Sequence, residues 1–384
     1  MKIFLSFLQS SNTYPIPAYS FWEYYIKSGI IEAGYEWVEC PGVDWALGLV
    51  PQNKPEHLKW KQDTWEKTVA WLKKNPVDIF LSYLYPAQVD ETAIREIQKL
   101  GIPCVNFFCD NVREFRKAPV VYSVFDLNWV PEHKAVEWYV NAGYAYINLP
   151  MPMWVKPQYR VLKQEKNNQA TFIGSKDIQR TLLFESLVEH NPSLNLAIYG
   201  NGWKPDETPQ NNPVFPDYTY DKKIIFNINF IKEQGFTAFL RKLKYRNFNP
   251  EVSSKLASKV NNPLSFNDYN TLTAESMITL GVNRYPSFRY PLIQPDSYSR
   301  LRDIEAPMLG ACYLTEYTEG IESLYDIEND IAVYRNADEL AIKIKDIGAD
   351  LNRRKKLKIN GQQRALNENS IPNSLSKIIQ RLTH

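Results

Sequence analysis

The chain has 384 residues, of which 45 are basic and 43 acidic, so its net charge of +2 creates no overall field that would select nucleic acid or another highly charged partner. This length suggests two domains of ordinary size. A hydrophobic content of 44% with 23% charged residues is ordinary for a soluble protein.

The four cysteines argue against a structural zinc site, because they form no CxxC pair and have no histidine at metal-ligand spacing. Free thiols fit a reducing cytoplasm. The first residues carry no small-residue cleavage site, so 2–8 is interpreted as a first strand rather than as a signal peptide. No apolar run has the length that a bilayer crossing needs, and we expect a cytoplasmic protein.

Apolar runs of strand length alternate with helical stretches through residues 1–151. Continuous apolar strands between helices predict a parallel sheet that is covered on both faces. Ligands bind beyond the carboxyl ends of such strands, which here include Asp110, after the run 103–108. The expected strands are 2–8, 36–40, 78–83, 103–108, 127–130 and 144–149, and the expected helices are 20–33, 59–74, 89–100 and 132–142.

A second α/β unit is expected over residues 169–368, after a proline-rich stretch at 152–168 that is typical of a linker. Its first strand ends in the turn Gly174-Ser175, which precedes a helix over 178–189. A second strand, at 194–199, ends in Tyr199-Gly200.

Residues 219–262 interrupt this pattern with nine basic and three acidic residues, a local balance of +6. A basic amphipathic helix over 235–246 can lie on an anionic membrane surface. The alternative is an inserted helix that packs its phenylalanines on its own domain. The apolar and the basic residues of this helix are Phe236, Phe239, Leu240 and Leu243, and Arg241, Lys242, Lys244 and Arg246.

The stretch 298–325 contains the most informative pattern of the second half. Helical spacing of apolar residues over 301–309, closed by Gly310 as a left-handed cap, predicts a helix before a short buried strand at 311–315. A second helix is expected to begin at 319–320. On the first helix Arg302 and Glu305 are i,i+3 neighbours, so a cation and a partly exposed carboxylate should emerge on one face. Such a face suits a ligand with a phosphate and a diol, although a surface ion pair is the plain alternative.

These residues resemble the carboxyl-terminal domain of GT-B glycosyltransferases, in a variant similar to the CgeB-like and family 1/4-like groups. The motif elements are Arg302-x-x-Glu305, the turn at Gly310, Glu319-Gly-Ile-Glu-x-Leu324, the run 331–334 and a helix that contains Glu339. The resemblance implies two Rossmann-like α/β domains whose parallel sheets face a cleft, with a last helix, 369–384, that crosses back to the first domain. It also implies that Glu305 binds the ribose of a nucleotide-sugar donor.

A glycosyltransferase has to neutralise the nucleotide diphosphate that leaves the sugar. The sequence contains no Asp-x-Asp motif to hold a metal, so arginines and helix N-termini are expected to neutralise this charge, with no metal and no cofactor. The residues expected at the donor are Gly174, Ser175, Arg180, Tyr199, Gly200, Arg300, Arg302 and Glu305.

Two residues of the first domain are candidates for catalysis on the acceptor side. Asp110 suits a base or a ligand of the acceptor, and the capping of the following helix is an equal alternative for it. His133 has the chemistry of a base, but a histidine at a helix start is more often a surface residue.

The expected activity is metal-independent transfer of a sugar from a nucleotide sugar to a glycan, lipid-linked or protein acceptor, with peripheral contact at the inner membrane face through 235–246. An epimerase or hydrolase of nucleotide sugars on the same fold stays open, as does a non-catalytic nucleotide-binding protein. Ser297 stands eight residues before Glu305, where retaining members of the wider group carry a second glutamate. The stereochemical outcome therefore stays open too.

Overall fold

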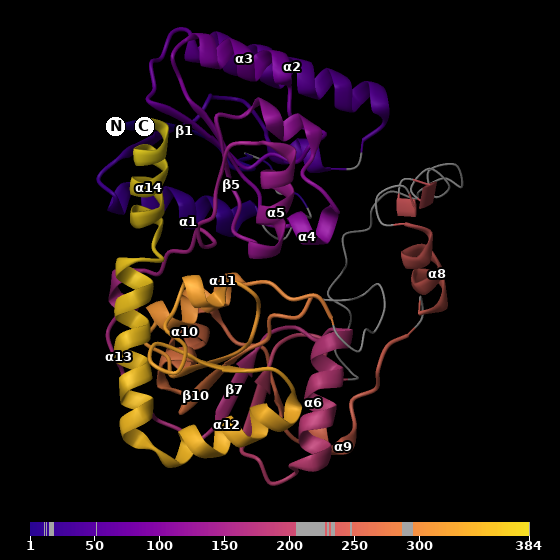
Figure 1. Ribbon diagram of the computed structural model, residues 1–384, viewed down its shortest axis with the longest axis vertical. Helices are drawn as coiled ribbons and strands as arrows, with labels where there is room; N and C mark the ends of the chain where they lie inside the picture. Colours follow the sequence, from indigo (N-terminus) through magenta and orange to yellow (C-terminus); the bar gives the residue numbers. More distant parts are fainter. Residues whose placement is uncertain are drawn as a thin grey trace. The chain divides into compact units, whose positions relative to one another are not determined.

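The computed structural model describes residues 1–10, 12, 14, 19–50, 52–204, 227–228, 230–231, 235–245, 248–285 and 295–383. The described chain forms two compact α/β units (Figure 1). The first unit contains residues 1–154 and the carboxyl-terminal residues from 370, and the second contains the described residues from 155 to 369. None of the described helices is both long and apolar enough to span a membrane.

Six parallel strands form the sheet of the first unit, in the order β2-β1-β3-β4-β5-β6. The four inner strands are almost entirely buried, as expected when both faces of a parallel sheet are covered. The helices and strands of this unit are β1 (Lys2–Ser6), α1 (Tyr19–Glu32), β2 (Glu36–Val38), η1 (Ala46–Leu49), α2 (Lys54–Leu72), β3 (Ile79–Ser82), α3 (Glu91–Lys99), β4 (Cys104–Phe107), α4 (Asn111–Glu114), η2 (Val120–Val124), β5 (Leu127–Trp129), α5 (His133–Ala142), β6 (Tyr146–Ile147) and α14 (Ile371–Thr383).

The second unit has a parallel sheet of the same size, in the order β12-β11-β10-β7-β8-β9. The predicted α/β class with two parallel sheets is therefore confirmed. The helices and strands of this unit are η3 (Pro157–Tyr159), β7 (Ala170–Ile173), α6 (Ile178–His190), β8 (Leu196–Tyr199), α8 (Phe236–Lys244), α9 (Ser254–Ala257), β9 (Val260–Asn261), α10 (Phe266–Glu275), β10 (Ile278–Gly281), α11 (Leu301–Met308), β11 (Tyr313–Glu316), η4 (Ile321–Ser323), β12 (Ala332–Tyr334), α12 (Ala337–Ala349) and α13 (Leu351–Asn367).

One predicted element is wrong and one lies partly outside the described residues. The helix expected to begin at 319–320 is a single 3-10 turn, η4, which starts after the left-handed Gly320. Just after this turn, the Tyr325 hydroxyl donates a hydrogen bond to the Asp303 carbonyl oxygen at 2.7 Å, which joins this segment to α11. Of the predicted insertion 219–262, residues 219–226, 229, 232–234 and 246–247, Arg246 included, lie outside the described part of the chain.

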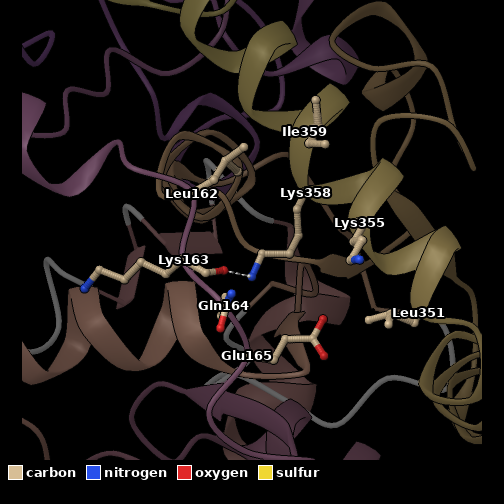
Figure 2. Close-up of a pocket in the computed structure, with 8 residues that line it drawn as sticks. All are labelled: Leu162, Lys163, Gln164, Glu165, Leu351, Lys355, Lys358 and Ile359. Atoms are coloured by element: carbon tan, nitrogen blue, oxygen red, sulfur yellow. Dashed lines mark hydrogen bonds between the residues drawn. The ribbon is translucent and has the colours of Figure 1, made fainter.

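Helix α13 binds the segment that leads into β7. The buried Lys358 ammonium donates to the carbonyl oxygens of Lys163 at 2.8 Å and Ala274 at 3.0 Å. Beside it, Arg354 pairs with Glu165 at 3.1 Å. Figure 2 shows Lys358 reaching the Lys163 carbonyl. Residues Leu162–Glu165 and residues of α13 line a pocket here, whose volume is about 460 Å³. These contacts make the segment part of the second unit.

Helix α14 returns to the first unit and lies beside α1 (Figure 1). The fully buried Ile371 sits over Gly29 of α1, where an added Cβ would lie 2.5 Å from Ile371 Cγ2. The proline that follows Ile371 is favourable in the first turn of a helix, where no backbone N–H is needed. The predicted return of the last helix to the first domain is therefore confirmed, and it depends on a glycine.

We expect Gly29→Ala to destabilise the chain, although alanine in a helix interior is normally more favourable than glycine by about 1 kcal/mol. The new methyl group overlaps Ile371, and overpacking of this kind costs about 1–3 kcal/mol. In an Ile371→Gly background all three overlapping atoms, Cβ included, are gone, and the same substitution should stabilise the chain. Urea unfolding of the four variants measures this change of sign. If Gly29→Ala stabilised the chain in the native background, the contact between α1 and α14 would be refuted.

Candidate functional site

In the second unit, the loops that follow β7 and β8 lie directly against each other. The Gly174 N–H donates to the Tyr199 carbonyl oxygen at 2.7 Å, and Trp203 Nε1 donates to the Gly174 carbonyl oxygen at 2.8 Å. Gly200 has φ +145°, and a Cβ there would lie 2.2 Å from the Gly174 oxygen. Only glycine allows this approach. The structure therefore brings together Gly174, Tyr199 and Gly200, which the sequence singled out.

The helix after this loop begins at the predicted residue. Helix α6 starts at Ile178, and its N-cap is Asp177, whose carboxylate accepts from the Arg180 N–H at 2.8 Å and lies 3.2 Å from Arg180 Nε. Because a carboxylate already occupies the positive end of α6, this helix terminus is a poor anion site.

Three arginines converge near the same loop: Arg180 of α6, Arg300 just before α11, and Arg302 in its first turn. Burial lowers the pKa of Arg180 to about 10; the Asp177 charge opposes this shift, and the charges of Arg300 and Arg302 add to it. Arg180 Nη1 also donates to the Ser175 carbonyl oxygen at 2.7 Å. We call Arg180, Arg300 and Arg302 the arginine cluster. Like charges held together away from water favour the binding of an anion.

A second ion pair supports the arginine cluster. Arg284 Nε lies 2.7 Å from Glu316 Oε1, at the end of β11, and the Arg284 carbonyl oxygen accepts from Arg300 Nη2 at 2.8 Å. The Nε atom of Arg300 is buried and has no hydrogen-bond partner among the described residues. A buried donor of this kind is unusual and is suited to an acceptor that a ligand brings.

Glu305 is buried, with 9% of its surface exposed, which corrects the expectation of a partly exposed carboxylate. Its cover comes from α10, where the Tyr269 hydroxyl donates to Glu305 Oε2. The Arg302 guanidinium lies 5.0 Å from the centre of the Tyr269 ring. Burial raises the pKa of Glu305, and the charge of Arg302 and then the hydrogen bond from Tyr269 oppose that shift.

Asp303 fixes the direction in which α11 presents these groups. Its buried carboxylate accepts from the Tyr313 hydroxyl at 2.8 Å, the Thr315 hydroxyl at 2.9 Å and the Arg300 N–H at 3.0 Å. These bonds join the first turn of α11 to β11. Asp303 and Tyr269 were not among the predicted site residues. The apolar spacing gave no signal for Asp303, because two residues after Leu301 it falls on the opposite face of the predicted helix.

In the first unit, Asp110 follows β4 as the N-cap residue of α4, but its side chain makes no capping hydrogen bond. Glu132 supplies the cap, because its two oxygens accept from the N–H groups of Asn111 at 2.5 Å and Val112 at 3.2 Å. The capping alternative for Asp110 is therefore wrong. Burial, and then the charge of Asp110, raises the pKa of the fully buried Glu132 to about 8.

His133 is the first residue of α5, and its side chain is exposed. The residue before it, Glu132, is fully buried and was not among the predicted site residues. Its signal was an acid two residues after the predicted strand at 127–130. Within the described ranges, no three His, Cys, Asp or Glu side chains form a group that could hold a metal ion.

A family model described as "Glycosyl transferase-like" matches residues 179–380, which is more than half of the chain. No curated protein matches the sequence significantly.

Solved structures of similar fold cover nearly the whole chain. Sucrose-phosphate synthase from Thermosynechococcus elongatus has 12% identity and a TM-score of 0.54, over 100% of this chain and 99% of that one. HepE from Anabaena in complex with UDP has 11% identity and a TM-score of 0.55, over 99% of each chain. A further HepE structure contains UDP-glucose. A glycosyltransferase from Rickettsia africae has 12% identity and a TM-score of 0.56, over 99% of this chain and 97% of that one. At these identities the likeness establishes the GT-B fold.

We expect Gly200→Ala to destabilise the second unit strongly, by about 3 kcal/mol or more, because the methyl group would overlap the Gly174 carbonyl oxygen. Gly143→Ala is the matched control. Gly143 also has a positive φ, +70°, but a Cβ there meets no atom within 4 Å. Its cost should be the backbone strain alone, about 1–2 kcal/mol. Equal losses in urea unfolding would refute the close approach of the two loops.

Proposed function

The chain belongs to the glycosyl transferase-like family, whose enzyme class is glycosyl transfer, and on that premise we propose that it moves a sugar from a nucleoside diphosphate donor to an acceptor hydroxyl without a metal. The CgeB-like assignment within the family stays a prediction. The donor site that we propose is the arginine cluster together with Glu305.

The arginine cluster is the observation that carries this proposal. When the bond between the sugar and the diphosphate breaks, negative charge builds up on the leaving phosphate. The arginine cluster already holds three cations together, so it can stabilise that charge without rearrangement. The buried Nε–H of Arg300 lacks a partner among the described residues and is available to the phosphate. A metal ion is then not required, which is the reason for proposing metal-independent transfer.

Glu305 is proposed to bind the ribose of the donor. Its carboxylate lies one turn from Arg302, so a nucleotide whose phosphates meet the arginine cluster brings its ribose diol close to Glu305. UDP is the first nucleotide to test, because HepE, which has a similar fold, was solved with UDP and with UDP-glucose.

Asp110, rather than His133, is proposed to meet the acceptor. Asp110 lies at the carboxyl edge of the first sheet, where ligands of parallel sheets bind, and its side chain is not used as a helix cap. The acceptor is proposed to be a glycan, a lipid-linked sugar or a protein. An epimerase, a hydrolase or a non-catalytic nucleotide-binding protein would form no glycoside, so product analysis with candidate acceptors separates these alternatives from transfer.

Helix α8 supports a further part of the proposal, contact with an anionic membrane surface. Phe236 is 60% exposed and Leu240 is 50% exposed, whereas the packing alternative requires these side chains to be covered. Arg241 and Lys244 lie on the same short helix. Apolar side chains that can enter the interface, beside cations that attract anionic lipid, are the features of an interfacial helix.

We expect Arg241→Glu/Lys244→Glu to reduce sedimentation with vesicles that contain phosphatidylglycerol, because each cation near such a surface contributes about 1 kcal/mol. Lys74→Glu/Lys99→Glu changes the net charge equally at two exposed positions of the first unit and is the control. Equal binding by both variants would remove α8 from the proposal.

The main test measures UDP binding by calorimetry in a buffer that contains EDTA. We expect Glu305→Ala to lose about 2–4 kcal/mol, or roughly 30- to 1000-fold in affinity, since two hydrogen bonds to a charged group disappear. Because Glu305 is buried and accepts the Tyr269 hydroxyl, we also expect a loss of folding stability of about 1–3 kcal/mol.

Two controls separate these effects. Tyr269→Phe removes the internal hydrogen bond and keeps the carboxylate, so it should lower stability more than UDP affinity. Glu189→Ala removes an exposed glutamate of α6 and should change neither quantity. Unchanged UDP affinity in Glu305→Ala would exclude this residue from the donor site. Binding that required added magnesium or manganese would contradict the metal-free proposal.

A further inference from the structure

Glu132 is a fully buried carboxyl group that the proposed reaction does not yet use. It follows β5, and its oxygens accept the N–H groups of Asn111 at 2.5 Å and Val112 at 3.2 Å. These are the two residues directly after Asp110. A carboxyl group that accepts two consecutive backbone N–H groups fixes the turn on which Asp110 sits.

The same turn is held from two other directions. The Tyr139 hydroxyl of α5 donates to Asn111 Oδ1 at 2.9 Å. Asn111 Nδ2 donates to the Phe108 carbonyl oxygen, at the end of β4, also at 2.9 Å. Asp110 therefore lies on a rigid turn between a strand and a buried carboxyl group, which is the support that a catalytic group needs.

The titratable groups that interact with Glu132 come from three elements: Asp110 from the N-cap of α4, Cys109 from the end of β4, and Tyr139 from α5. Burial, and then the charge of Asp110, raises the pKa of Glu132 to about 8. At neutral pH Glu132 therefore keeps its proton in the folded chain. A second negative charge beside Asp110 arises only above that pH.

We propose that Glu132 is a positioning residue for Asp110: it fixes the turn that presents the Asp110 carboxylate and holds its own proton, so that this edge of the sheet carries one negative charge rather than two. The inference rests on the proposed function. In the transfer step, the acceptor O–H bond breaks and its proton passes to Asp110. The acceptor oxygen bonds to the anomeric carbon, and the diphosphate leaves with the electrons of the broken C–O bond.

The first test follows release of UDP from UDP-glucose, with water as the acceptor, across pH 5.5 to 9.5. In the native chain we expect UDP release to fall as the pH rises through about 8. Ionised Glu132 then places a second negative charge beside the Asp110 carboxylate and repels it from its position. Glu132→Gln cannot ionise, so its profile should lack this fall. Its release should be lower at every pH, because the amide keeps only one of the two oxygens that accept the N–H groups. Its UDP affinity should stay native. Asp110→Asn should lower release about 100-fold or more at every pH. The same alkaline fall in Glu132→Gln would overturn the proposal.

The second test does not depend on turnover. Difference infrared spectroscopy of the full chain should show a protonated carboxyl band that disappears as the pH rises through about 8. The band should be absent in Glu132→Gln and should disappear at lower pH in Asp110→Asn, because the neighbouring charge is gone. A midpoint that Asp110→Asn leaves unchanged would overturn the coupling. If the band behaves as expected but UDP-glucose is not turned over, the failure lies in the proposed function with this donor.

Discussion

The buried carboxylate of Asp303 is the constraint on which the proposed donor site depends. A carboxylate that is removed from water needs hydrogen-bond donors, and Asp303 finds them in Tyr313, Thr315 and the Arg300 N–H. Those bonds join α11 to β11, so a residue that faces the sheet determines where Arg302 and Glu305 point. Burial still raises the pKa of Asp303, although the hydrogen bonds act in the opposite direction. The Asp303 carboxylate therefore fixes the orientation of α11 and lowers the folding stability to some extent.

Both units use a carboxyl group to hold the backbone after a strand, but the consequences differ. In the second unit Asp177 caps its own helix, so its charge stays local and pairs with Arg180. In the first unit the cap comes from Glu132, 22 residues along the chain from Asp110. A cap from the neighbouring strand keeps the Asp110 side chain out of the helix terminus, and it places a second acid beside Asp110. One arrangement pairs two opposite charges, and the other brings together two acids, of which Glu132 keeps its proton at neutral pH.

The sequence predicted the architecture because continuous apolar runs and Gly310 are local signals. Parallel strands with both faces covered leave such runs, and a glycine at φ +73° ends α11 where the pattern stops. The burial of Glu305 was not predictable, because its cover, Tyr269, comes from a helix 36 residues earlier. Glu132 was missed for a similar reason. Its partners are the N–H groups after β4, and only the pairing of β4 with β5 makes them neighbours.

The two candidate sites share one physical property: each holds ionisable groups of the same kind close together. In the second unit the fold holds three cations together, and in the first it holds two acids at one strand edge. Like charges gathered in partly buried positions destabilise a folded chain unless a species of opposite sign joins them. In the proposed function, the species that joins the arginine cluster is the diphosphate of the donor. For Asp110 and Glu132 the species of opposite sign is a proton. The transfer of a sugar from a nucleoside diphosphate to a hydroxyl group produces both a diphosphate anion and a proton.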